Sequence, residues 1–519
     1  MEETKTQNSG VKTISVVMFL VLFSKISGLV REMVFLRLLG TESAEAAAFT
    51  FAALIPRQFL DAAFAAAISA GFIPIFNIYL EKRSREETFA LAHNFISFVM
   101  VITISISVVG VFLAGFASNI YFNAEDYEAA VLGAQLLRIT VFTVFLTSTA
   151  FALTGVLQSL GGFYIPSIMS LVSNGLILAF VALFWREGGV VGLSIAFLIG
   201  NLAQVLIFWI PLRKRGFRYK WRLNFKDEGL RQILRLTPLV MISSWLFPIN
   251  GLINGAIANN HNSAYFVELS SANTIFIVLT GMFILSVTNV MFPKLSREIA
   301  RNENKEEFSK VLSTTLSGMM FILLPMAVGI YFLRVPIVRI IYEGGEFSAY
   351  ATERTSFALG ILSIGIIGYG LTTILSRALF ADKDGKTPAI ITIIAIIINI
   401  AIALIFTNAL GIGGPALATA VSISVAGFGM YAVAIKKYRI FDTKQAANFI
   451  KMILATGVMF VVIYFVQPLL IGMHDIFEIA IITTTGVLIY AVGSAALKIN
   501  EAQTAKGMIL SRIRRSANE

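Results

Sequence analysis

Four charged side chains fall inside an otherwise apolar segment near the N-terminus, in the stretch SKISGLVREMVFLRLLG (24–40). Lys25, Arg31 and Arg37 follow one another at roughly two-turn intervals of a helix, and Glu32 adjoins Arg31. Charges at membrane depth are costly unless they pair with one another or face water. Arg31 is the least able to reach either surface, and its planar fork of donors suits a phosphate. The pattern therefore predicts a cationic, water-filled cavity that binds an anionic headgroup.

A second group of charges follows in the stretch IPRQFLD. Arg57 and Asp61 stand at i and i+4, and Pro56 interrupts the local helical hydrogen bonds and exposes polar groups to a cavity. In the alternative interpretation these charges only pair, Arg57 with Asp61 and Arg31 with Glu32 or other neighbours. The sequence leaves both interpretations open, and we place all four charged residues in the candidate substrate site together with Lys25.

Three further polar residues lie within expected spans. Arg138, in the span expected over 127–158, either lines the cavity or is a paired or snorkelling residue. Asn174, in the middle of the span expected over 163–185, is added to the candidate substrate-binding residues. Glu268, near the outer part of a later span, is interpreted as a surface residue in preference to a gate residue.

The elements that must position these residues are membrane-spanning helices. Of 519 residues, 57% are hydrophobic and 14% are charged, whereas soluble domains have about 45–50% and about 25%. Apolar stretches of about 20 residues recur and predict an all-α polytopic protein with about 14 transmembrane helices. Cysteine is absent and three histidines are scattered, so we expect no metal site and no cofactor. No Walker loop or hydrolase motif is present, so we expect a transporter and not an enzyme.

The net charge of +11 is explained by the loops and not by nucleic acid. With the N-terminus inside, almost all loop lysines and arginines fall on the inner side, as the positive-inside rule requires. Both termini are therefore expected in the cytoplasm. The polar stretch MEETKTQNSG reads as a cytoplasmic tail and not as a signal peptide.

An internal repeat divides the chain. GFIPIFNIYLEKRSREETF resembles NVMFPKLSREIARNENKEEF, with Pro74 and Phe89 spaced like Pro293 and Phe308. The repeat predicts two six-helix lobes of the same orientation, as in rocking transporters. The expected divisions are an N-terminal lobe over 1–212, a cytoplasmic basic linker over 213–231, a C-terminal lobe over 232–437, and two last helices with a cytoplasmic tail over 438–519.

Over nearly its whole length the chain resembles the MurJ (MviN) family of lipid II flippases. The matching pieces include SKISGLVRE, LLRIT, YIPSIMSLVSNG, MFPKLSRE and ALFADKDGKTP, in the family's order. The resemblance implies the MOP exporter fold and movement of undecaprenyl-diphosphate-linked peptidoglycan precursor from the inner to the outer leaflet by alternating access. The membrane would be the bacterial cytoplasmic membrane. The polyprenyl tail would stay in lipid, along a groove made by the last two helices.

The match to the family's arginines is incomplete. The family's G-x-x-R-[DE] is present and its arginine is Arg31. In span 2 the family reads L-P-N-x-x-R-R, and its two arginines fall on Leu60 and Asp61, so that Arg57 is expected to substitute. In span 8 the family's A-D-R places its arginine at Thr274, which completes the candidate substrate-binding residues.

Other functions stay open. A flippase for another undecaprenyl-linked glycan, such as an exopolysaccharide or O-antigen unit, is the alternative that the missing span 8 arginine favours. Drug–cation antiport would require acids where this chain has cations, and a membrane-embedded polymerase would require large outer loops. We expect coupling to the membrane potential or to an ion. We expect a monomer whose partners are the lipid-linked glycan and membrane lipids.

Overall fold

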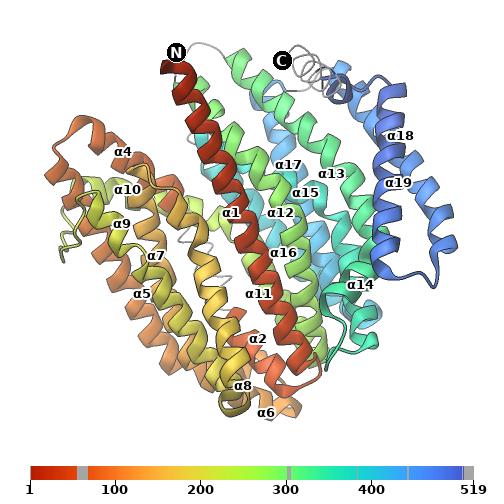
Figure 1. The fold of residues 1–519 in the computed structure, drawn as a ribbon, viewed down its shortest axis with the longest axis horizontal. Helices are drawn as coiled ribbons and strands as arrows, with labels where there is room; N and C mark the ends of the chain where they lie inside the picture. The colour runs from red at the N-terminus through yellow and green to blue at the C-terminus, as the bar shows by residue number, and fades with distance from the viewer. Residues whose placement is uncertain are drawn as a thin grey trace. The chain divides into compact units, whose positions relative to one another are not determined.

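The computed structural model describes residues 2–54, 56, 68–300, 305–382, 384–440, 443–504 and 507 (Figure 1). Within these ranges the chain is helical, apart from turns, loops and one isolated bridge between Gly344 and Phe347. Nine helical stretches of the described chain are long and apolar enough to cross a membrane. The pair α14 (Ala349–Ile364) and α15 (Ile366–Ala381), bent by 51°, makes a tenth if it counts as one span. The expected all-α, multi-pass fold is confirmed, and the count of 14 stays a prediction.

The chain forms two compact units, Met1–Ser270 and Ser271–Glu519. The boundary falls inside a continuous helix, α12 (Ser263–Ala300). The other elements of the first unit are α1 (Glu2–Leu39), α2 (Ala44–Leu54), the π-helical turn η2 (Ile68–Phe72), α4 (Ile73–Lys82), α5 (Arg85–Tyr121), η3 (Ala124–Asp126), α6 (Tyr127–Thr140), α7 (Phe142–Ser159), α8 (Tyr164–Leu206), α9 (Trp209–Lys214), α10 (Glu228–Ser244) and α11 (Leu246–His261).

Helix α8 contains most of two consecutive spans that the apolar runs predict, over 163–185 and over 189–212, and a single glycine separates them. Gly189 has φ +51°, outside the helical region, and breaks the helix. The ring of Phe180 lies against the backbone on both sides of this break, where a Cβ on Gly188 or Gly192 would come within 2.7 or 2.5 Å of it. Glycine is thus required here both for the turn and for the close approach.

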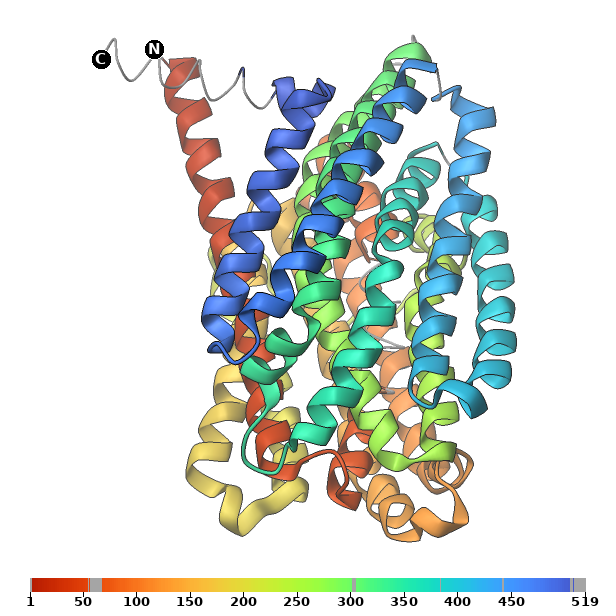
Figure 2. The same ribbon diagram turned by 90° about the vertical axis from the view of Figure 1, so that its right-hand side faces the viewer.

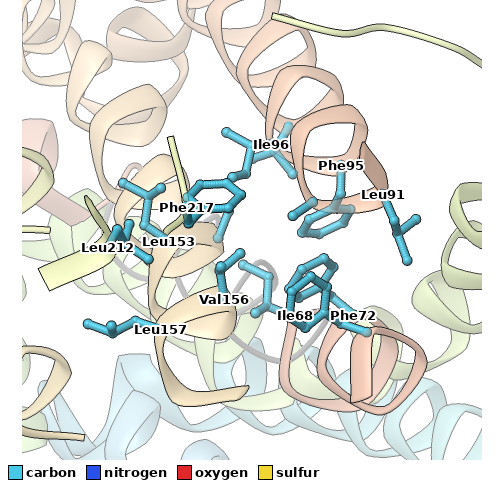
Figure 3. Close-up of a cluster of buried hydrophobic side chains, with 14 of the residues drawn as sticks. Ile68, Phe72, Leu91, Phe95, Ile96, Leu153, Val156, Leu157, Leu212 and Phe217 are labelled. Atoms are coloured by element: carbon cyan, nitrogen blue, oxygen red, sulfur yellow. The ribbon is translucent and has the colours of Figure 1, made fainter. Parts of the chain in front are cut away.

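Buried side chains from η2, α5, α7 and the end of α9 meet in one apolar core (Figure 3). Phe72 stacks on Phe95 with ring centroids 4.4 Å apart. Phe217, which follows α9 in the sequence, is 1% exposed and lies in the same core. The core therefore fixes the chain that leaves α9 as well as the helices themselves.

The second unit continues from α12 through helices that pack closely. Gly368 of α15 lies against α17, where an added Cβ would come within 2.4 Å of the Ser424 Cα. The elements after α12 are α13 (Lys305–Tyr342), α14 and α15 as above, α16 (Lys386–Leu410), α17 (Gly413–Tyr438), α18 (Thr443–Val466), η4 (Gln467–Leu470) and α19 (Asp475–Ala496).

The last two helices, α18 and α19, pack on each other and on α13 (blue and green in Figure 2). At one end Arg339 of α13 forms an ion pair with Asp475 at 2.7 Å. At the other end Glu501 accepts hydrogen bonds from Ser317 of α13 and from Asn448 of α18, the latter at 2.8 Å. Both ends of the pair are therefore attached to α13.

Candidate functional site

Helices α1 and α8 lie side by side and bring residues of the candidate site together (Figure 1). The Ser24 hydroxyl donates to the Ser167 carbonyl at 2.7 Å. One turn on, Gly28 lies beside Asn174, where an added Cβ would be 3.5 Å from the Asn174 side-chain nitrogen, an ordinary van der Waals distance. These two contacts join α1 to α8 at consecutive turns of α1.

Arg31 is held by Asn174 across this contact. The Arg31 Nη1 donates to the Asn174 Oδ1 at 3.0 Å, between residues 143 positions apart. The Asn174 Nδ2 in turn donates to the Ser27 Oγ at 2.9 Å. The amide is therefore oriented by Ser27 with its oxygen toward the guanidinium, which fixes the direction of the arginine fork.

The surroundings of Arg31 are mixed in polarity. The Arg31 Nη2 lies 3.5 Å from the Glu32 Oε2, and the two side chains are 11% and 15% exposed. The Phe197 ring lies below the guanidinium, 4.9 Å from its Cζ, a distance at which cation–π attraction acts. Phe197 is itself packed edge-on against Phe49 at 5.2 Å. Chemically, the arrangement presents a partly exposed, positioned cation whose charge Glu32 partly offsets.

Arg138 belongs to a separate part of the first unit. It is exposed in the last turn of α6, on a stripe of exposed residues that also contains Glu128, Val131 and Gln135. Within the described part of the chain it makes no hydrogen bond or ion pair. It lies 11 residues after Tyr127 at the start of α6, about 16 Å along the helix. At that depth an exposed arginine is costly in lipid, so this stripe suits water and not acyl chains.

The structure places the other predicted residues apart from Arg31 or does not describe them. Lys25 is exposed on α1, six residues before Arg31 and so about 120° around the helix from it. Arg57 and Asp61 lie outside the described residues. Thr274 is partly buried on α12 in the second unit. Of the candidate residues, Arg31, Glu32 and Asn174 are therefore brought together.

The sequence did not single out two residues of this site, Ser27 and Phe197. Ser27 lies four residues before Arg31, on the same face of α1, and that spacing was available to find it. Phe197 lies on the second half of α8, and no sequence signal connects it with Arg31. The interpretation of Glu268 as a surface residue is wrong. It is fully buried, and its Oε1 accepts a hydrogen bond from the Thr41 hydroxyl at 3.0 Å.

No cluster of three or more His, Cys, Asp or Glu side chains suited to a metal ion occurs among the described residues. The groups that the structure brings together around Arg31 are its guanidinium, the Asn174 amide, the Glu32 carboxylate and the Phe197 ring.

Comparison with known proteins gives a consistent result. A family model described as lipid II flippase MurJ matches residues 36–484. The chain is 28% identical over 488 residues to the probable lipid II flippase MurJ of Thermotoga maritima, which covers 92% of this chain and 95% of the relative. It is 26% identical over 446 residues to the lipid II flippase MurJ of Thermosipho africanus, with coverage of 85% and 88%.

Solved structures share the fold. Lipid II flippase MurJ in an inward closed conformation matches with a TM-score of 0.77 at 24% identity, over 93% of this chain and 98% of that one. An inward-facing multidrug resistance MATE family transporter of the MOP superfamily matches with a TM-score of 0.63 at 15% identity, over 82% and 98%. From the match of the family model over most of its length, the chain belongs to the MurJ family of lipid II flippases.

Proposed function

We propose that the protein moves lipid II, the undecaprenyl-diphosphate-linked peptidoglycan precursor, from the inner to the outer leaflet of the bacterial cytoplasmic membrane by alternating access. The observation that carries the mechanism is Arg31, positioned by Asn174 and partly exposed in a chain of this family. The guanidinium binds the diphosphate, and Asn174 keeps its fork in the binding direction. The protein acts as a transporter and not as an enzyme.

The flipped headgroup is a large polar anion, so its path across the membrane must be hydrated and lined by polar groups. The exposed stripe on α6, with Glu128, Gln135 and Arg138 around Val131, offers a second, largely polar surface to that path. In this proposal Lys25 and Arg57 add positive charge to the path. Asp61 offsets part of that charge, and Thr274 contributes a polar hydroxyl. Membrane potential or an ion drives the cycle.

The undecaprenyl tail stays in lipid and runs along α18 and α19. These helices carry exposed apolar side chains along their lengths. Among them are Leu454, Val461, Phe465, Val487 and Val492, each more than half exposed. The attachment of both helix ends to α13 keeps this surface connected to the second unit.

The topology that we propose has 14 spans, two six-helix lobes and both termini in the cytoplasm, and we propose a monomer. Two contacts within the first unit support the grouping of its loops on two sides of the membrane. The expected outer residues Asn123 and Asn260 are joined by a hydrogen bond of 2.9 Å. The expected inner residues Arg85 and Arg215 are joined by another, from the guanidinium to the carbonyl.

Complementation tests the proposal. A bacterial strain depleted of its lipid II flippase should grow when this chain is expressed, and should lyse when the Arg31→Ala variant is present at the same membrane level. Failure of the wild-type chain to rescue, together with no lipid II movement in proteoliposomes, would overturn the assignment.

The second candidate is a flippase for another undecaprenyl-linked glycan, which the threonine at position 274 favours, since the family pattern has arginine there. Movement of an exopolysaccharide precursor, but not of lipid II, by the same proteoliposomes would select it.

A further inference from the structure

The segment that begins in the last turn of α9, residues 213–226 (RKRGFRYKWRLNFK), is the most basic part of the chain, with seven lysines and arginines and no acid. We call it the basic–aromatic segment. Trp221 and Phe225 are 62% and 58% exposed. None of its exposed basic side chains forms an ion pair within the described residues. They are Arg213, Lys214, Arg218, Lys220, Arg222 and Lys226.

This segment is ordered by buried polar groups of α5. The Asn94 side chain exchanges two hydrogen bonds with the Asn224 backbone, donating to its carbonyl at 2.8 Å and accepting from its N–H at 2.7 Å. The Ser97 hydroxyl bonds the Tyr219 hydroxyl at 2.8 Å and accepts from the Arg222 N–H at 3.2 Å. Asn94 and Ser97 are fully buried. The basic side chains therefore extend from a backbone with a defined position.

Aromatic contacts hold the segment at two points. Phe217 lies edge-on to Phe89 at 5.3 Å within the apolar core drawn in Figure 3. Phe225 lies edge-on to Phe98 of α5 at 6.0 Å. Burial raises the pKa of the Tyr219 hydroxyl, and the Ser97 hydrogen bond lowers it less, so that the phenol remains neutral at physiological pH.

The attachment points on α5 show the depth of the segment. The start of α5 carries Arg85, Glu86, Glu87 and the polar His93, whereas residues 98–117 carry no charged residue. About 20 apolar residues span the hydrocarbon core. The bonds at Asn94, Ser97 and Phe98 place the segment where this apolar run begins, which is the level of the lipid headgroups. Exposed Trp, Arg and Lys are typical of that level.

We propose that the basic–aromatic segment is a binding site for anionic phospholipids of the cytoplasmic leaflet. Lys220, Arg222 and their basic neighbours bind the phosphate, and Trp221 and Phe225 lie against the glycerol and upper acyl chain. The exposed aromatic side chains favour a lipid over free phosphate, because free phosphate has no apolar part for them to contact. The site is separate from Arg31, and the proposal does not depend on which lipid-linked glycan is carried.

The test uses the purified full chain in a neutral detergent, titrated with fluorescent phosphatidylglycerol or phosphatidylcholine. Each basic residue near an anionic surface contributes about five-fold in affinity, equivalent to about 1 kcal/mol. The double variant Lys220→Gln/Arg222→Gln should bind phosphatidylglycerol about 25-fold more weakly, with phosphatidylcholine binding unchanged. The matched control is Lys82→Gln/Arg83→Gln, which removes two exposed basic residues from another inner loop and should leave phosphatidylglycerol binding unchanged.

A second pair of variants tests the ordering. Tyr219→Phe and Asn94→Ala keep every charge and each remove hydrogen bonds to α5, so they should weaken phosphatidylglycerol binding by about 2- to 12-fold, the ordinary range for a hydrogen bond. Three results would overturn the proposal. They are unchanged lipid binding by the Lys220/Arg222 variant, an equal loss in the Lys82/Arg83 control, and displacement of the lipid by millimolar inorganic phosphate.

Discussion

An aspartate in place of Asn174 tests whether Arg31 is available to an anion. The change keeps the size of the side chain and the acceptor that Arg31 Nη1 reaches at 3.0 Å, but adds a negative charge. At that distance, with an effective permittivity near 20, the attraction is about 5 kcal/mol. The Glu32 carboxylate already lies 3.5 Å from the Arg31 guanidinium, and the side chains of Arg31 and Glu32 are both partly exposed. We therefore take about half of this attraction, roughly 2–3 kcal/mol. The substrate anion would have to overcome this attraction, which corresponds to about 30- to 150-fold weaker binding.

The assay is binding and transbilayer movement of lipid II by purified Asn174→Asp protein in proteoliposomes. The expected result is a normally folded protein with strongly reduced binding and movement. The matched control is Asn201→Asp, the same change on the same helix, where the partners are the side chains of Thr147 and Gln204 and the Phe197 carbonyl, none of them charged. Wild-type lipid II binding by Asn174→Asp would refute the reasoning. It would mean that the anion binds equally well when a neighbouring carboxylate neutralises the charge of Arg31.

Three further predictions concern the rest of the chain. Asn448→Ala should lower the free energy of unfolding by about 1–3 kcal/mol, measured as a lower thermal midpoint, because Glu501 loses the bond that joins α18 to the end of the chain. Burial raises the pKa of Asp384, but hydrogen bonds from Lys437 and Thr387 outweigh it and hold that pKa below its usual value. The resulting stability is present above about pH 4 and lost as the pH falls through the folded pKa. Asp384→Asn should abolish this small acid-dependent loss, about 1 kcal/mol or less, in thermal melts between about pH 2 and 5. Tags should report the topology. We expect labelling from outside at Asn123, Asn260 and Gly411, and only from inside at Arg83, Lys220 and Lys437.

Much of the fold was predictable because the membrane restricts the choices. Apolar runs of sufficient length must be helices in lipid, so composition and spacing gave the all-α class directly. The division of α8 followed from the same rule, since the polar stretch REGG interrupts two apolar runs and Gly189 is where the helix breaks. The ordered path of residues 217–225 along α5 was not predictable. It depends on Asn94 and Ser97, which sequence alone shows only as polar residues of a helix.

The candidate site was predictable in part. The cost of a charge at membrane depth identified Arg31, and Asn174 was polar in an apolar span. Their contact joins residues 143 positions apart, and no local pattern contains that distance. Glu268 was misjudged because its place near a span end resembles an exposed position. Its burial depends on packing around Thr41, in the turn between α1 and α2.

The central claim is that Arg31 binds the headgroup that crosses the membrane. The most direct measurement is lipid II movement by purified Arg31→Ala protein in proteoliposomes, at equal reconstitution and with a thermal midpoint near that of the wild type. We predict movement reduced by about 100-fold, the upper range for a lost charged hydrogen bond, and partial activity for Arg31→Lys, which keeps the charge but not the fork. Wild-type movement by the alanine variant would show that Arg31 only pairs with Glu32 and Asn174, and would contradict the mechanism.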